Sequence, residues 1–329
     1  MRPDAHNRIL TGAAAACLLA AFGVSLCVGR YPLGLADIPG ALLGGEGMAA
    51  QVFWRLRLPR SLAVLVSGGA LGVAGATYQA LLGNPLAAPD VAGVSGGATL
   101  GAAVMIVCFG GAGLAAGAFA GGLCALAAAL LITRACGQRG TAGLVLSGIL
   151  ISALVKAGIM LLKTLADREG ELAAIEFFTM GSFAQITWRA LPSLCGGAAL
   201  GLFVLALLRR QIPLLALGDE QAAALGVRVQ PMRAAVLGGA TLSVCAVSAH
   251  AGVIAFLPLI APHAARLLLR GRSRGLLPLS FLLGALLLLL ADVAVRLIPG
   301  AELPVSVLTT ALGVPMLVSL MVKGGRADA

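Results

Sequence analysis

The chain has 329 residues, 60% of them hydrophobic and only 11% charged. This balance excludes a soluble globular protein, because 23 Lys and Arg and 13 Asp and Glu residues cannot form the charged shell that a soluble chain of this length needs. The formal net charge of +10 does not indicate nucleic-acid binding, since the basic residues lie in short gaps between apolar blocks rather than along one face or in one tail.

Apolar blocks of roughly 20 residues, the length that crosses a bilayer as a helix, recur along the whole chain. The stretch 234–269 is too long for one crossing, because it would reach roughly 54 Å as a helix, and we divide it at His250 and Gly252. The expected spans are 11–28, 61–82, 91–109, 112–133, 142–162, 190–208, two within 234–269, 276–298 and 304–322. The sequence therefore predicts an all-α membrane protein of about ten transmembrane helices, with residues 1–329 as a single transmembrane domain.

The orientation of the chain follows from its basic residues. The first apolar block comes after Arg2 and Arg8 and has no small-residue cleavage site before Arg30, so we expect a retained first helix rather than a signal peptide. More Lys and Arg residues lie on the side of the N-terminus than on the opposite side of the membrane, which predicts cytoplasmic N- and C-termini. The outer loop is the exception, because three arginines crowd residues 55–60.

Glycine is abundant, with 45 residues, and recurs at a spacing of four within several expected spans. Small residues at this spacing let helix backbones approach closely in lipid, so the pattern predicts a tightly packed bundle. The repeats are Gly68–Gly72, Gly93–Gly97–Gly101, Gly113–Gly117–Gly121 and Gly197–Gly201.

Motifs for catalysis are missing from the sequence, which has no GxxxxGK[ST] loop for phosphates, no GxSxG and no HExxH. The seven cysteines form no CxxC pair, and we interpret them as small residues within helices. Asp292 is expected near the outer surface, and Lys156 lies somewhat outside the midplane, where its side chain can reach the interface. We therefore expect no enzyme, no metal site and no cofactor in this chain, and a passage that takes its energy from a partner.

Four segments carry a resemblance to a known family. They are RLPRSLAVLVSGGALGVAGATYQALLGNPLAAPDVAGVSGGATLG (57–101), GDEQAAALGV (218–227), GVIAFLPLIAPHAARLL (252–268) and ELPVSVLTTALGVPMLVSL (302–320). In order and spacing they resemble the binding-protein-dependent permeases for iron complexes and vitamin B12, the FecCD-type permeases of type II ABC importers. The resemblance implies a homodimer of ten-helix subunits in a bacterial or archaeal inner membrane. It also implies two ATP-binding cassette subunits, which bind ATP and Mg²⁺, and an extracytoplasmic substrate-binding protein as partners.

The segment 218–228 begins with two acidic residues, continues with small helix-forming residues and ends at a glycine, a pattern typical of a short surface helix. The resemblance implies that this cytoplasmic segment, between the sixth and seventh helices, is the coupling helix that docks on the ATPase. An ordinary interfacial helix is the alternative. The residues assigned to coupling are Gly218, Asp219, Glu220, Ala223, Leu225 and Gly226.

The resemblance also implies a cytoplasmic gate, formed by the loop after the second helix and the start of the fifth. Asn84, Leu86, Thr141 and Ala142 are the candidate gate residues. A plain helix-ending turn explains the Asn-Pro pair at 84–85 almost as well, because proline disfavours helix for the residue before it.

Arg57, Arg60 and Arg296 match family positions that receive acidic residues of the binding protein, so the resemblance implies a docking site there. The alternatives are an i, i+4 pair with Asp292 for Arg296, and lipid headgroup anchoring for the other two. His263 is interpreted as a packing or hydrogen-bonded residue rather than a ligand. The family more often has Val-Gly where this chain has Leu-Pro at 257–258, and the extra proline predicts a kink in the eighth helix.

The function implied by the resemblance is ATP-driven import of a metal chelate, with a ferric siderophore expected first and cobalamin or haem next. An ion-coupled secondary carrier that works without an ATPase is the alternative. An intramembrane enzyme is disfavoured, because no nucleophile or metal constellation lies within the spans.

Overall fold

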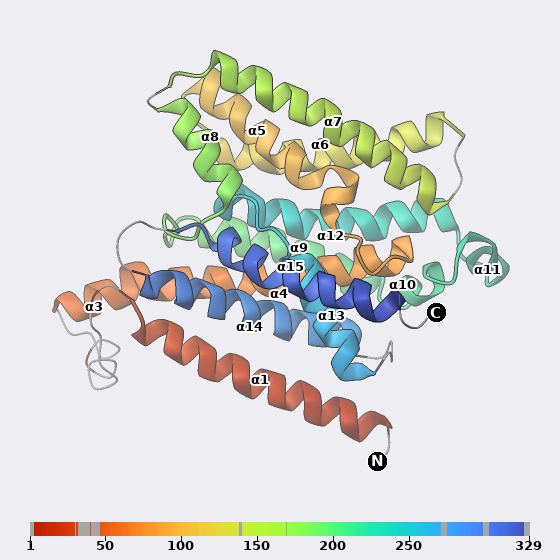
Figure 1. Cartoon of the computed structure of the whole chain (residues 1–329), viewed down its shortest axis with the longest axis horizontal. Helices are drawn as coiled ribbons and strands as arrows, with labels where there is room; N and C mark the ends of the chain where they lie inside the picture. The colour runs from red at the N-terminus through yellow and green to blue at the C-terminus, as the bar shows by residue number, and fades with distance from the viewer. Residues whose placement is uncertain are drawn as a thin grey trace.

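A computed structural model describes residues 3–29, 31, 40, 47–137, 140–168, 170–270, 275–298 and 303–325, and these are helical with no strand among them (Figure 1). Each expected span corresponds to a helix. Six are long and apolar enough to cross a membrane, and four are shorter apolar helices. The ten are α1 (Pro3–Cys27), α4 (Leu58–Leu82), α5 (Val94–Phe109), α6 (Leu114–Ala135), α7 (Thr141–Leu165), α9 (Leu191–Leu207), α12 (Val229–Ala251), α13 (Leu257–Leu269), α14 (Leu276–Leu297) and α15 (Val305–Gly325). The predicted all-α membrane fold is confirmed.

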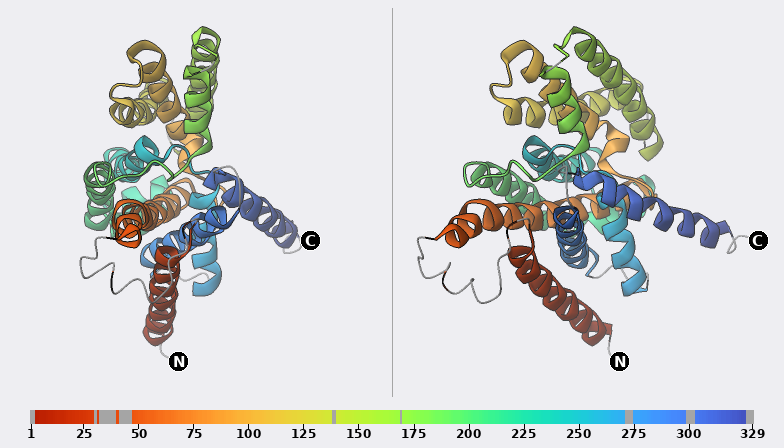
Figure 2. Two further views of the ribbon diagram at one scale, coloured as in Figure 1. Left: turned by 90° about the vertical axis from the view of Figure 1, so that its left-hand side faces the viewer. Right: turned by 60° about the vertical axis from the view of Figure 1, so that its left-hand side comes forward.

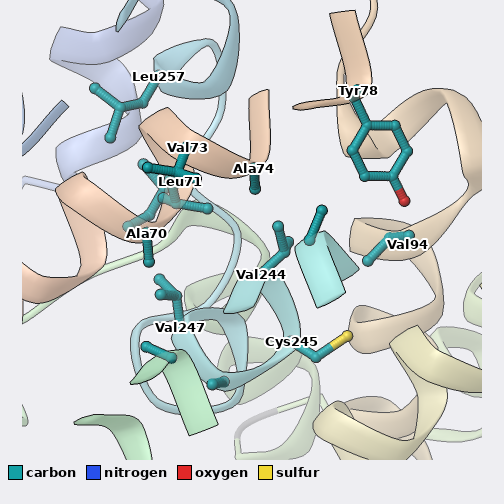
Figure 3. Packing of buried hydrophobic residues seen from close by; sticks show 14 of the residues in the cluster. Ala70, Leu71, Val73, Ala74, Tyr78, Val94, Val244, Cys245, Val247 and Leu257 are labelled. Atoms are coloured by element: carbon teal, nitrogen blue, oxygen red, sulfur yellow. The ribbon is translucent and has the colours of Figure 1, made fainter. Parts of the chain in front are cut away.

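The helices run side by side, with α1 at one edge of the bundle and α7 at the opposite edge (Figure 1). In the most apolar window of each helix, 83% of the residues are buried in α4 with its N-terminal extension and 72% in α12, against 22% in α1. The central pair therefore holds the core together. Figure 3 shows side chains of α4, such as Leu71, packed among those of α12, such as Val244, and the Tyr78 hydroxyl lies 2.7 Å from that of Thr241.

The glycine repeats mark places where two helix backbones touch. A Cβ added at Gly68 would lie 2.4 Å from the carbonyl oxygen of Gly284, so α4 and α14 could not pack as they do with any larger residue there. A Cβ added at Gly101 of α5 would lie 2.0 Å from the carbonyl oxygen of Gly117 in α6. The prediction of tight packing is confirmed at these contacts. Gly113, in contrast, precedes a helix with a φ of 72°, and it serves the turn rather than a helix contact.

The expected break within 234–269 is confirmed between α12 and α13. Gly252 ends α12 with a φ of 71°, and a Cβ there would lie 2.2 Å from the carbonyl oxygen of Phe178. The predicted kink at Pro258 is wrong, because α13 begins at Leu257 and the proline lies in its first turn. Proline is tolerated there, since the first backbone N–H groups of a helix have no partner within the helix.

Six short elements lie between the spans, and only α11 (Asp219–Ala224) among them was expected from the sequence. On the outer side, α3 (Met48–Val52) and the π-helical η1 (Phe53–Arg57) extend α4, and α8 (Glu171–Met180) follows α7. The remaining three are η2 (Pro89–Ala92), α10 (Gln211–Leu215) and α11 (Asp219–Ala224). An ion pair of 2.7 Å between Lys163 and Glu176 joins α8 to the end of α7.

Candidate coupling, gate and docking sites

The segment expected to form a surface helix does so, as α11. Gly218 precedes it with a φ of 101° and Gly226 follows it with a φ of 82°, conformations that favour glycine. Glu220 and Ala223 are exposed, and Leu225 is 59% exposed. The segment therefore presents a small, partly apolar surface outside the bundle.

An ion pair that the sequence analysis missed joins α11 to the central helix α12. Arg233, in the second turn of α12, is 3% exposed, and its Nη1 donates to Oδ2 of Asp219 over 3.3 Å. Its Nη2 donates to Oδ1 of the same carboxylate, so the contact is bidentate. The two residues are 14 positions apart across a loop, a spacing that carries no signal in a sequence.

Arg233 also lies close to the start of α7. Together with Leu144 and Thr133 it lines a void of about 10 Å³ beside Gly140, the residue before α7 begins. A void of this size lies at the lower limit for one water molecule, so the side chains around it are closely packed. One buried arginine thus contacts the surface helix and borders the junction of α6 and α7.

The proposed gate segments lie at the ends of α4 and α7. Asn84 follows the end of α4, and its Oδ1 accepts a hydrogen bond of 2.8 Å from the backbone N–H of Leu86, so the turn expected there is present. Leu86 is 43% exposed, and Thr141 is the first residue of α7. The η2 turn packs against α7, where a Cβ added at Gly148 would lie 1.8 Å from the carbonyl oxygen of Val91. This contact links the two segments, while their role as a gate stays a prediction.

The three arginines assigned to docking form one cluster, in which Arg60 and Arg296 contact the fully buried Asp292 and Arg57 lies near Arg296. Arg60 donates to Oδ1 of Asp292 from Nε over 2.9 Å and from Nη2 over 2.8 Å. Arg296 lies 2.9 Å from Oδ2, so the i, i+4 pair considered from the sequence is present. The contact between Arg60 and Asp292, which are 232 positions apart in the sequence, was not expected.

Two of these arginines also bind the C-terminal end of α1. Both donate to backbone carbonyl groups there that have no partner within the helix. The acceptors are the carbonyl oxygens of Leu26, Cys27 and Tyr31 for Arg57, and those of Ser25 and Val28 for Arg296. Arg57 is 5% exposed, which leaves little of it for lipid headgroups. Three arginines and one carboxylate give the cluster a net charge of +2.

The sequence did not settle the roles of several other polar residues within the spans. His263 is buried in α13, in agreement with a packing role. The neighbouring Arg266 donates to Oε1 of Gln79 over 2.5 Å and so joins α13 to α4. Lys156 is exposed on α7. Within the described part of the chain, His, Cys, Asp and Glu form no group of three or more that could hold a metal ion.

Comparisons of the sequence and of the structure with known proteins all match permeases of ABC importers. Residues 17–323 match the model of the FecCD transport family. The chain is 34% identical to the molybdate import system permease protein MolB of Haemophilus influenzae over 100% of both chains. It is 40% identical to the vitamin B12 import system permease protein BtuC of Vibrio cholerae over 84% of this chain and 85% of that one. A solved structure of a metal-chelate type ABC transporter in an inward-facing conformation has a TM-score of 0.87 and 33% identity, and covers 96% of this chain and 99% of that chain.

Proposed function

This chain belongs to the FecCD transport family of ABC importer permeases, and from that premise we propose that two copies of it form the passage of an importer for a metal chelate. It is a multi-pass permease of a prokaryotic plasma membrane and works with ATPase subunits and a binding protein. It is not an enzyme, because ATP hydrolysis takes place in the separate ATPase subunits. The proposal adds the stoichiometry of two copies and two ATPase subunits, the residues for coupling, gating and docking, and the cargo.

The observation that carries the proposal is the bidentate ion pair between Asp219 of α11 and Arg233 of α12. The ATPase would dock on the exposed face of α11, and a displacement of α11 would act on Arg233 through Asp219. Arg233 belongs to a central helix and borders the start of α7, where the gate residue Thr141 lies. The movement would therefore reach the gate through one rigid contact rather than through a flexible loop.

A second copy would cover α7. This helix presents an apolar stripe at its surface, which includes Leu146, Leu150, Leu154 and Leu161, all more than half exposed. Lipid alone could cover such a stripe, since both environments are apolar. The gate favours a partner chain, because Leu86 is also exposed and lies near the loop that packs on α7. Two gates that face each other across a twofold axis would close one passage.

Docking of the binding protein would use the net charge of +2 on the cluster of Arg57, Arg60 and Arg296. Since Arg57 is almost fully buried, the cluster would act through its field, which sets orientation and association rate more than affinity. Arg60→Gln removes one positive charge and Asp292→Asn removes the negative one. Both substitutions disturb the same cluster, so the direction of the rate change separates a charge effect from structural damage. We expect Arg60→Gln to slow association and Asp292→Asn to accelerate it, whereas an unchanged rate in Arg60→Gln would remove the docking assignment.

We place a ferric siderophore first as the cargo, and cobalamin and haem next. The relative MolB, a molybdate import permease, widens the choice to molybdate. The measurement that decides is which of these compounds the cognate binding protein retains, followed by competition in uptake.

The test of the proposed function is co-purification with the ATPase and its dependence on α11. Leu225→Asp should abolish co-purification, because it places a charge on the large exposed apolar side chain of the segment. Leu86→Asp is the matched control, since Leu86 is also an exposed leucine on the cytoplasmic side but lies outside the segment 218–228. If Leu225→Asp binds the ATPase as well as the unaltered chain does, α11 is not the coupling helix. Gradient-driven uptake by the chain alone would instead indicate a secondary carrier.

A further inference from the structure

A large groove opens on the cytoplasmic half of the bundle, between α4, α9, α10 and α14. Its volume is about 1260 Å³, above the usual range of about 300–1,000 Å³ for small-molecule pockets. Its walls are mostly apolar and include Val73, Ala76, Leu202, Ala206, Phe281 and Leu282. A groove of this size and character within a membrane-spanning bundle is not left empty, because lipid or protein fills it.

Along α4, the deepest point of the groove lies about one leaflet of a bilayer from the cytoplasmic end of the helix. Its deepest wall residue on α4 is Val73, and α4 ends on the cytoplasmic side at Leu82. Nine residues of helix correspond to about 14 Å along the axis. Half of a hydrocarbon core of about 30 Å is about 15 Å. The groove therefore extends from the inner interface to about the centre of the membrane.

The cytoplasmic end of the groove carries positive charge. Arg209 and Arg210, which follow α9, both line it and both are exposed. No acidic residue lines the groove, and neither arginine has an ion pair with any described residue. Two guanidinium groups without an ion pair among the described residues therefore lie at the cytoplasmic mouth of an apolar groove.

We propose that this groove binds an anionic phospholipid of the cytoplasmic leaflet. Its phosphate contacts Arg209 and Arg210, and an acyl chain lies along α4 towards Val73. A cytoplasmic ATPase could cover only the mouth, because the deep end lies within the membrane. In the end-on view α9 and α15 lie at opposite edges of the bundle, and the helix α7 lies on a third side (Figure 2, left). The groove is thus separate from the surface proposed for the second copy.

The test measures lipid binding to the purified chain in dodecyl maltoside by native mass spectrometry. The probes are phosphatidylglycerol and phosphatidylcholine with the same acyl chains, and inorganic phosphate as competitor. The variants are Arg209→Gln/Arg210→Gln, which removes the charge, and Ala206→Phe, which fills part of the groove. Arg134→Gln/Arg228→Gln is the matched control, because these arginines are also exposed on the cytoplasmic side and do not line the groove.

We expect the unaltered chain and the control to prefer phosphatidylglycerol by roughly 30-fold, the value for two arginines close to an anionic headgroup. The Arg209/Arg210 variant should lose most of this preference, and Ala206→Phe should weaken the binding of both lipids. Preference unchanged in the arginine variant would overturn the proposal, and so would binding unchanged in Ala206→Phe. Displacement of the lipid by inorganic phosphate at an equal concentration would also overturn it, because the site would then hold an anion without an acyl chain. None of these results depends on the transport function.

Discussion

Replacement of Asp292 by Asn tests the cluster at the outer end of the bundle. The carboxylate is fully buried and contacts Arg60 over 2.8 Å and Arg296 over 2.9 Å. Asn keeps the shape but removes the only negative charge of the cluster, so its arginines face one another without compensation. Removing one partner of a buried ion pair costs about 3–5 kcal/mol. Asn can still accept a hydrogen bond from Arg60, so we take the lower value, about 3 kcal/mol or roughly a 150-fold change in the unfolding equilibrium.

The free energy of unfolding can be measured by titration with a denaturing detergent in mixed micelles, with helix content as the signal. Asp167→Asn is the control, because this aspartate is exposed in the outer segment and should shift stability by no more than about 0.5 kcal/mol. The double variant Asp292→Asn/Arg296→Gln should be less destabilised than the sum of the single variants, since it removes one of the uncompensated charges.

If Asp292→Asn lowers the free energy of unfolding by less than about 1 kcal/mol, this reasoning is refuted, because a loss that small is typical of solvent-exposed ion pairs. Strict additivity in the double variant would refute the view that one carboxylate serves two arginines.

Three further predictions concern packing, coupling and gating. Gly75→Ala should cost about 1–3 kcal/mol, because the new Cβ would lie 1.8 Å from a backbone carbonyl oxygen of α13, whereas Gly238→Ala, with nothing within 4 Å, should be neutral or stabilising in the same detergent titration. Arg233→Gln should lower ATP-dependent uptake by about 2- to 30-fold while co-purification of the ATPase persists, and adding Asp219→Asn should lower it little further. Unimpaired uptake would show that the ion pair is not used. Asn84→Ala removes a hydrogen bond worth about 1 kcal/mol from the gate loop and should increase passive release of cargo from loaded proteoliposomes, so unchanged release would argue against the gate.

The helices could be predicted from the sequence because bilayer thickness imposes a length on every apolar block. The break at Gly252 was also accessible, since one block was too long for a single span. The short helix α8 was missed, because ten residues between two spans carry no length signal and its exposed side is polar only in part. Its place depends on contacts with α5 rather than on its own composition.

Among the candidate sites, too, some features could be predicted from the sequence and others could not. The surface helix α11 was visible as a local pattern of acidic residues, small residues and glycine. The contacts of Arg60 with Asp292 and of Arg233 with Asp219 were not, because a partner across the bundle leaves no trace in the spacing of a single sequence. The groove was also hidden, since glycine, alanine and leucine face lipid, neighbouring helices and cavities alike.

The central claim is that this chain transports only when ATPase subunits drive it. The direct measurement is uptake of the compound that the cognate binding protein retains, in radiolabelled form, into proteoliposomes that hold the chain, the ATPase subunits and the binding protein. The account predicts that uptake requires ATP and that it disappears when the ATPase is catalytically inactive. Uptake by the chain alone, driven by an ion gradient and unaffected by loss of the ATPase, would contradict it.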